Sequence, residues 1–260
     1  MFRPLVRLAL AFTCALGLQA QPPARQIRIA AASDLKWALE EAKAAFERDT
    51  PGITCALTFG ASGAFHAQLS QHAPFDLFLS ADTGYPERLV ADGLGRKEDL
   101  FPYAVGHLVL WVPKASPIPL EQLGLQGLLH PAARRIAMAN PRHAPYGRAA
   151  EATLKAAGLQ AQVADRLVLG ENIAQTAQFV QTGNADLGFL SRSLATSAAM
   201  RDQGRLWPVP DDLHPPLLQA GLILPWAQDA EAARAFRAWL TGPKGAALLQ
   251  RHGFSLPERK

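Results

Sequence analysis

Four short polar segments of this sequence could do chemistry together, because each combines small residues with a hydroxyl or amide side chain. They are Ala31-Ala32-Ser33, Gly60-Ala61-Ser62-Gly63, Ala144-Pro145-Tyr146-Gly147 and Gly170-Glu171-Asn172-Ile173. Each stands where a strand is expected to end and a helix to begin. A helix N-terminus leaves backbone N–H groups unpaired, carries about half a positive charge and attracts anions. The four segments therefore predict a cleft that binds a small oxyanion through neutral dipoles.

A second interpretation applies to each segment, because Ser and Asn are also preferred helix N-caps. On that interpretation Ser33, Ser62 and Asn172 satisfy backbone N–H groups and bind no ligand. The four positions together favour a site, since ligands of open α/β sheets bind beyond the carboxyl ends of strands. The segments supply hydrogen-bond donors and almost no acceptors. This suits a fully deprotonated tetrahedral dianion, whereas a protonated phosphate would also need an acceptor.

Asp34 follows Ser33 directly and introduces a negative charge next to the first segment. We expect its carboxylate to face solvent in the first helical turn, where the helix dipole favours an acidic residue. The alternative is a carboxylate that faces the cleft. In that position it would repel a dianion or select a protonated anion.

Short apolar strands alternate with amphipathic helices along the chain. Strands are expected at residues 27–31, 53–59, 76–80, 105–112, 136–139, 167–169, 187–190 and 218–224. Helices are expected at residues 35–46, 64–72, 85–92, 148–157, 174–181, 231–240 and 243–251. This alternation is typical of parallel sheets with helices on both faces. Two α/β sets and a proline-rich connection at residues 207–216 predict two domains, with the last elements returning to the first domain.

The first 20 residues have the layout of a secretory signal peptide. Two arginines precede an apolar run from Leu8 to Leu18, and small residues then lead to Ala20. The run has 11 residues, whereas a helix that spans a membrane needs ~20. We therefore expect cleavage between Ala20 and Gln21 and export to the periplasm.

Composition and charge exclude several classes of protein. A hydrophobic content of 49% with both charge signs interspersed is typical of a globular chain. The leader holds two basic residues and no acidic one, so the rest of the chain carries 24 Lys and Arg against 22 Asp and Glu. This near-neutral balance gives no sign of nucleic-acid binding. Cys14 lies in the leader and Cys55 stands alone, so no disulfide is expected.

Motifs for other chemistries are incomplete in this sequence. Gly60 to Ala64 approaches the G-x-S-x-G nucleophile elbow of hydrolases, but Ala64 replaces the last glycine. A secreted serine hydrolase that uses Ser62 is the alternative from a different class, with candidate bases His107, His143, His214 and His252. Neither an H-E-x-x-H zinc pattern nor a G-x-x-x-x-G-K-[ST] loop occurs. No direct metal ligands and no cofactor are therefore predicted, and the chain is not expected to be an ATPase.

Five stretches of the sequence together resemble the periplasmic molybdate-binding proteins, the substrate-binding components of molybdate ABC importers. They lie at residues 30–36, 59–63, 76–82, 140–147 and 170–176. The resemblance runs from about Ile27 to Phe254, with the motifs in order and in spacing. It implies an α/β fold of the two-lobed periplasmic binding protein type (type II), each lobe a doubly wound mixed sheet, with two crossover segments as the hinge. After the signal peptide at residues 1–20, lobe 1 would comprise residues 21–103 and 215–260, and lobe 2 residues 104–214.

The resemblance also implies which residues bind the oxyanion. Ser33 and Ser62 would contribute hydroxyl and backbone N–H groups from the first lobe. Tyr146 and Ile173 would contribute backbone N–H groups from the second lobe. Further candidates are their neighbours Ala32 and Asn172. Some family members add a tyrosine hydroxyl where this chain has Ser191, so Ser191 contributes its shorter hydroxyl, is replaced by a water, or makes no contact.

The function that the resemblance implies is that of a non-enzymatic, monomeric receptor. It would bind molybdate, and tungstate with it, in an interlobe cleft and deliver the anion to an ABC transporter permease with its ATPase. Lobe closure about the hinge would complete the shell of donors, and cavity size would select against sulfate. A receptor for another oxyanion such as sulfate, or for a small organic anion, is the alternative within binding proteins.

Overall fold

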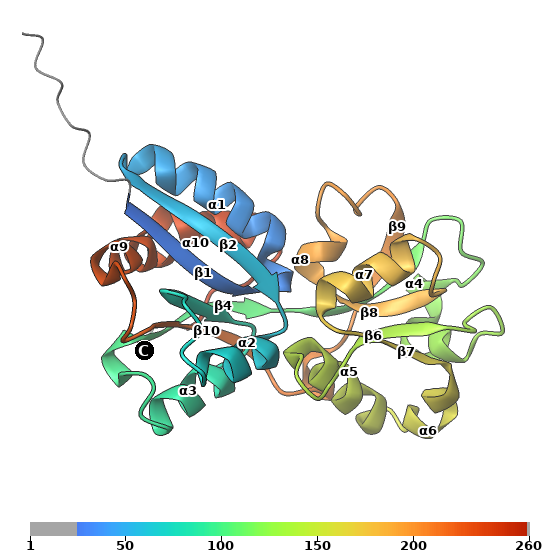
Figure 1. The fold of residues 1–260 in the computed structure, drawn as a ribbon. Helices are drawn as coiled ribbons and strands as arrows, with labels where there is room; N and C mark the ends of the chain where they lie inside the picture. The colour runs from blue at the N-terminus through green and yellow to red at the C-terminus, as the bar shows by residue number, and fades with distance from the viewer. Residues whose placement is uncertain (1–24, 259–260) are drawn as a thin grey trace, which may run out of the picture.

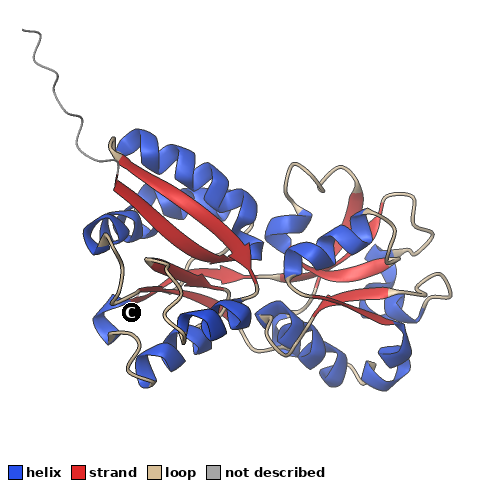
Figure 2. Cartoon of the chain, viewed as in Figure 1, coloured by secondary structure: helices blue, strands red, loops and turns tan. Residues whose placement is uncertain are grey.

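The computed structural model describes residues 25–258, which form two α/β lobes joined by two connections (Figure 1). The expected signal peptide at residues 1–20 lies outside the described residues. Within the described part, none of the helices has both the length and the apolar character that crossing a membrane requires. Figure 2 shows that each lobe has a central sheet with helices packed around it. The expected fold class, two lobes built on mixed sheets, is confirmed.

The strands are β1 (Arg25–Ala32), β2 (Ile53–Gly60), β3 (Leu77–Ser80), β4 (Leu100–Gly106), β5 (Leu108–Pro113), β6 (Ile136–Ala139), β7 (Leu167–Gly170), β8 (Leu187–Ser191), β9 (Gly204–Pro208) and β10 (Leu217–Ile223). The α-helices are α1 (Lys36–Asp49), α2 (Ser62–Leu69), α3 (Gly84–Ala91), α4 (Leu120–Leu123), α5 (Pro145–Ala156), α6 (Gln160–Val163), α7 (Ile173–Gln181), α8 (Arg192–Ala195), α9 (Ala230–Thr241) and α10 (Pro243–Arg251). Short 3-10 turns complete the chain: η1 (Ser33–Leu35), η2 (Lys97–Asp99), η3 (Gly124–Leu129), η4 (Ala164–Arg166) and η5 (Asp211–Leu213).

The first lobe is built on a five-stranded sheet in the order β2-β1-β3-β10-β4. β1 pairs in parallel with β2 and β3, and β10 pairs antiparallel with β3 and β4. Because side chains alternate along a strand, Ile29 packs in the core beneath α1, α9 and α10, whereas Ala30 packs beneath α2 and α3. Figure 1 shows these two groups of helices on opposite faces of the sheet. The carboxyl ends of β1 and β2 therefore lie side by side. The first two polar segments, which follow these strands, begin at the same edge of the sheet.

The second lobe repeats this arrangement with a sheet in the order β7-β6-β8-β5-β9. β6 pairs in parallel with β7 and β8, and β5 pairs antiparallel with β8 and β9. Its core is one hydrophobic cluster that includes the fully buried Trp111 and Phe189. β6 and β7 lead into the loops before α5 and α7, which are the third and fourth polar segments.

The structure corrects two details of the expected elements. The single strand expected at residues 105–112 is two strands, because β4 ends at Gly106 in the first sheet and β5 begins at Leu108 in the second. His107 is thus the first crossover, and the expected lobe boundary after residue 103 falls inside β4. The proline-rich stretch begins inside β9, whose last two residues, Trp207 and Pro208, pair with β5 at the edge of the sheet. Proline is tolerated on edge strands, where one side needs no ladder partner.

An ion pair between Arg28 and the buried Asp76 connects strands of the first lobe. Asp76 is fully buried and accepts hydrogen bonds from the Arg28 guanidinium at 3.0 Å, and from the backbone N–H groups of Arg28 and Gln228 at 2.7 Å. Burial alone would raise the pKa of Asp76, but these hydrogen bonds together lower it below its ordinary value. The carboxylate joins β1, β3 and the segment after β10.

Asp76→Asn is expected to lower the free energy of unfolding by about 2 kcal/mol at pH 7, because charge-assisted hydrogen bonds are lost. Since the pKa is depressed in the folded state, the wild-type contribution is present above the unfolded pKa and is lost as the pH falls through the folded-state value. Urea unfolding of both proteins at neutral and acidic pH checks this. A stability difference that does not shrink on acidification contradicts the account.

Candidate functional site

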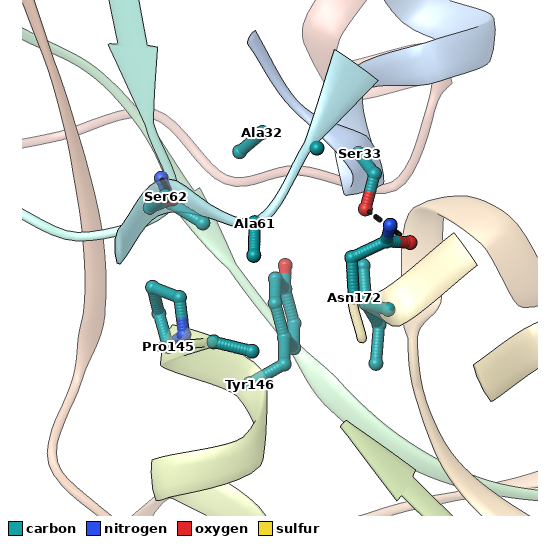
Figure 3. Close-up of a pocket in the computed structure, with 11 residues that line it drawn as sticks. Ala32, Ser33, Ala61, Ser62, Pro145, Tyr146 and Asn172 are labelled. Atoms are coloured by element: carbon teal, nitrogen blue, oxygen red, sulfur yellow. Dashed lines mark hydrogen bonds between the residues drawn. The ribbon is translucent and has the colours of Figure 1, made fainter. Parts of the chain in front are cut away.

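The four polar segments meet at one cavity between the lobes (Figure 3). Its volume is about 10 Å³. It is lined by Ala32, Ser33, Gly60, Ala61, Ser62, Ala81, Ala144, Pro145, Tyr146, Asn172 and Ile173. Six of the seven residues expected at the site therefore line this cavity, and only Ser191 does not. A cavity of this size has room for about one water molecule. The lobes are thus closed on each other, and entry of a larger solute requires them to separate.

The donors at this cavity are neutral. α2, α5 and α7 begin at Ser62, Pro145 and Ile173 respectively, and the first N–H groups of a helix have no partner within it. Proline has no N–H, so Tyr146 provides the first backbone donor of α5. None of the 11 lining residues carries a formal charge. The cavity therefore presents helix N-termini and hydroxyl groups to a solute, an arrangement suited to an anion.

Ser62 is positioned by a neighbouring loop of its own lobe. The N-cap of α2 is Ala61, and the Ser62 side chain makes no cap hydrogen bond. Instead Ser62 Oγ accepts a hydrogen bond from the Ala81 backbone N–H at 3.0 Å. Its hydroxyl hydrogen is therefore left to donate to a solute in the cavity. The interpretation of Ser62 as a cap is wrong.

Ser33 reaches across the cavity to the second lobe. The N-cap of η1 is Ala32 and shows no side-chain cap. Ser33 Oγ lies 3.2 Å from Asn172 Oδ1 and accepts from the Ala174 N–H at 3.3 Å. Figure 3 shows the Ser33 hydroxyl and the Asn172 side chain pointing toward each other. The interpretation of Ser33 as a cap of its own helix is also wrong.

Asn172 is the helix cap that its sequence position suggests. Its Oδ1 atom accepts from the N–H groups of Ala174 and Gln175, each at 3.0 Å. These bonds satisfy the second and third donors of α7 and leave the Ile173 N–H, the first donor, at the cavity. Asn172 thus combines the two interpretations: it caps α7 and lines the cavity.

Asp34 does not face solvent, contrary to the expectation from the helix dipole. Only 1% of the residue is exposed. Its Oδ2 atom accepts from Gln219 Nε2 at 2.7 Å and from the Tyr146 hydroxyl at 3.1 Å. Burial raises the pKa of Asp34 to about 6, and the two hydrogen bonds limit the rise. The carboxylate lies behind Tyr146 and is not part of the cavity lining.

Ser191 lies away from the cavity and has a structural role. It is fully buried and is the N-cap of α8, where its Oγ accepts from the Leu194 N–H at 3.3 Å. The Ser193 hydroxyl lies 3.0 Å from the same atom. The residue therefore has partners of its own within the second lobe.

Contacts at the rim of the cavity hold the lobes together, and the sequence did not reveal them. The Gly63 N–H donates to the His143 carbonyl oxygen at 2.9 Å. Arg148 of α5 pairs with Asp82 and donates to the Tyr85 hydroxyl at 3.0 Å. His143 directly precedes the third polar segment and Arg148 directly follows it, but nothing local identifies their partners in the other lobe.

Among the described residues, no hydrogen bond joins Ser62 to any of the four histidines named as candidate bases. The hydrogen-bond partners of the four candidate histidines are Ser255 for His107, Glu171 for His143, Pro215 for His214 and Glu41 for His252. None of these bonds involves Ser62. Within residues 25–258, no group of three or more His, Cys, Asp or Glu side chains could hold a metal ion.

Two α/β lobes joined by two crossovers, with a small uncharged cavity between them, define the class of two-lobed solute-binding proteins. The family of bacterial extracellular solute-binding proteins matches this chain over residues 27–255. The chain therefore belongs to that family, which confirms the class implied by the sequence resemblance.

Relatives and solved structures agree with this assignment. The molybdate-binding protein ModA of Azotobacter vinelandii is 37% identical over 252 residues, which cover 97% of this chain and 98% of the relative. ModA of Rhodobacter capsulatus is 33% identical over 95% of this chain and 94% of its own length. The solved periplasmic molybdate-binding protein of A. vinelandii superposes with a TM-score of 0.82 at 31% identity, covering 89% of this chain and all of that one. The sulfate-binding protein SubI of Mycobacterium tuberculosis, at 15% identity and a TM-score of 0.73, shares the fold.

Proposed function

We propose that this protein is a periplasmic receptor that binds molybdate, and tungstate with it, in the interlobe cavity. The observation that carries the proposal is the convergence of four segments, two from each lobe, on one small cavity whose lining residues carry no formal charge. Their hydroxyl and backbone donors suit a tetrahedral dianion. Relatives that are 37% and 33% identical over nearly the whole chain are named molybdate-binding proteins.

The proposed mechanism is hinge closure on the anion. The anion docks on the hydroxyl and N–H groups of Ser33 and Ser62, and closure then brings the N–H groups of Tyr146 and Ile173 to its remaining oxygens. Because the cavity is small, the anion must displace the hydrogen bond between Ser33 and Asn172. The lobes then close only as far as the diameter of the anion allows. An anion that completes all four contacts stabilises the closed form by its differential affinity for that form.

The proposal extends to partners and location. The receptor delivers its anion to an ABC transporter permease with its ATPase and acts as a monomer in the periplasm. It neither catalyses a reaction nor holds a cofactor, and molybdate is its cargo. Selectivity over sulfate comes from cavity size, because the two dianions carry the same charge and neutral donors do not otherwise distinguish them.

Isothermal titration of the purified protein, stripped of bound anion, tests this function. We expect one-to-one binding of molybdate and of tungstate, with sulfate and phosphate giving no heat at the same concentrations. Binding of sulfate or phosphate in preference to molybdate would keep the oxyanion cleft but overturn the proposed cargo. A protein that binds none of the four anions contradicts the proposal as a whole.

A further inference from the structure

Asp34 is the centre of a buried hydrogen-bond network behind the cavity. Its Oδ2 atom accepts from Tyr146 in the second lobe and from Gln219 in β10 of the first lobe. Its backbone carbonyl accepts from the Ser193 hydroxyl of α8 at 2.8 Å. The second lobe thus contacts this one residue at both its side chain and its backbone.

The network connects the anion loops of both lobes to both crossovers. Asp34 directly follows Ser33, and Tyr146 provides the N–H group at the opposite wall of the cavity. Gln219 lies in β10, the strand that follows the second crossover, and its Oε1 atom accepts from the Tyr103 hydroxyl of β4 at 2.9 Å. β4 ends at Gly106, directly before the first crossover at His107, and a Cβ atom added at Gly106 would collide with the Tyr146 hydroxyl. The close approach of these strands to Tyr146 therefore depends on a glycine at the hinge.

The carboxylate of Asp34 is not neutralised by a cation. The causes that set the pKa of Asp34 are burial, which raises it, and hydrogen bonds from Gln219, Tyr146 and the backbone of Asp34 and Leu35, which limit the rise; no Lys, Arg or His is among them. The titratable groups that face it are the phenols of Tyr146 in α5 and Tyr103 in β4. Burial raises the pKa of both phenols well above the ordinary value, so both stay protonated and donate.

We propose that Asp34 is a positioning residue that joins lobe closure to the seating of Tyr146 at the anion cavity. The inference rests on the proposed function and names a residue outside the anion-binding set. When the lobes close, Tyr146 swings to Asp34, and the hydrogen bond fixes the first turn of α5 with its N–H toward the cavity. When they open, Asp34 loses the Tyr146 and Ser193 contacts and regains water.

Closure consequently depends on the protonation state of Asp34. Closing the lobes moves an ionised carboxylate out of water and next to a dianion, and both effects oppose closure. A neutral carboxyl group avoids both costs. Because the pKa in the closed form is raised to about 6, closing favours proton uptake. Anion affinity should therefore fall as the pH rises through this region and level off above it.

The experiment measures molybdate affinity by isothermal titration between pH 5.5 and pH 8 for wild type and variants. We expect Asp34→Ala and Tyr146→Phe each to weaken binding tenfold or more at pH 6. The double variant should bind no worse than the weaker single variant, because both changes remove the same hydrogen bond. Asp34→Asn, a mimic of the neutral carboxyl group, should bind at least as tightly as wild type does at the lowest pH and show no pH dependence. Asp99→Asn, a buried carboxylate away from the cavity, should behave as wild type.

The outcomes separate this inference from the function on which it rests. Failure of wild type to bind any oxyanion overturns the proposed function. Wild-type binding with an unchanged Asp34→Ala affinity overturns the positioning role alone. Additive losses in the double variant, or a pH profile of Asp34→Asn that follows wild type, overturn it as well. Thermal unfolding of each variant without anion establishes that the compared proteins are folded.

Discussion

Gly63→Ala is expected to weaken molybdate binding about 10- to 100-fold while leaving both lobes folded. The added Cβ atom would stand 2.8 Å from both Cα and Cβ of His143 in the other lobe, and would collide with the Tyr85 hydroxyl. Tyr85 can move at the end of its side chain, but the His143 backbone can move only if the lobes separate. Overpacking of this kind costs about 1–3 kcal/mol, and each 1.4 kcal/mol is about tenfold in affinity.

Titration calorimetry gives the affinity of the Gly63→Ala variant, and small-angle X-ray scattering with saturating anion reports whether the lobes still close. Gly84→Ala is the matched control, because it lies at the same edge of the first lobe and its added Cβ meets nothing closer than 4.0 Å. The control should bind as wild type does. An unchanged affinity in Gly63→Ala would mean that the anion-bound form does not retain the close approach of Gly63 to His143.

Ser62→Ala is expected to weaken anion binding by about 1–3 kcal/mol, because it removes a hydrogen bond to a charged group. This corresponds to roughly 5- to 150-fold in the dissociation constant. The substitution also removes the acceptor of the buried Ala81 N–H, so the free energy of unfolding without anion should fall too. Calorimetric titration and urea unfolding separate the two losses.

Ser191→Ala provides the comparison, since Ser191 is an equally buried serine that caps α8 away from the cavity. Loss of the cap should lower stability by about 1 kcal/mol and leave the affinity unchanged. A Ser62→Ala protein with wild-type affinity would remove Ser62 from the site. A loss of affinity in Ser191→Ala would bring that position into the site after all.

Most of the fold could be predicted because local rules and packing agree along this chain. The spacing of Leu39, Ala42 and Phe46 predicts a helix with one buried face, and these residues lie in the first-lobe core. The helix ends expected at Gly93 and Gly158 are confirmed, and both glycines have the positive φ typical of a residue just after a helix. In such segments one local pattern is enough to define the element.

The elements that were predicted wrongly are those whose limits depend on distant partners. The apolar residues from Val105 to Val112 read as one strand, since the sequence pattern does not reveal that His107 divides two sheets. β9 was missed because Pro208 and the prolines that follow it indicate a loop, and only pairing with β5 makes the segment a strand. Whether a segment joins a sheet depends on the strand with which it pairs, and that strand lies far away in the sequence.

The residues of the site likewise fall into those that local sequence signals locate and those whose position depends on distant partners. The segments around Ser33, Ser62, Tyr146 and Ile173 could be located because helix starts after strands have local signals, and they line one cavity. The orientation of Asp34 could not be predicted, because its partners Tyr146 and Gln219 are 112 and 185 residues away. A propensity rule for the first helical turn favours an exposed acidic residue, but burial between the lobes overrides it here.

The central claim, that a molybdate ion binds between these four segments, is tested most directly by anomalous diffraction at the molybdenum edge from crystals grown with molybdate. The account predicts a single molybdenum peak in the interlobe cavity. Its oxygens should lie within hydrogen-bond distance of the Ser33 and Ser62 hydroxyls and the N–H groups of Tyr146 and Ile173, and Ser33 should have left Asn172. A molybdenum peak elsewhere on the protein, or an empty cavity in a protein that binds molybdate in solution, would contradict it.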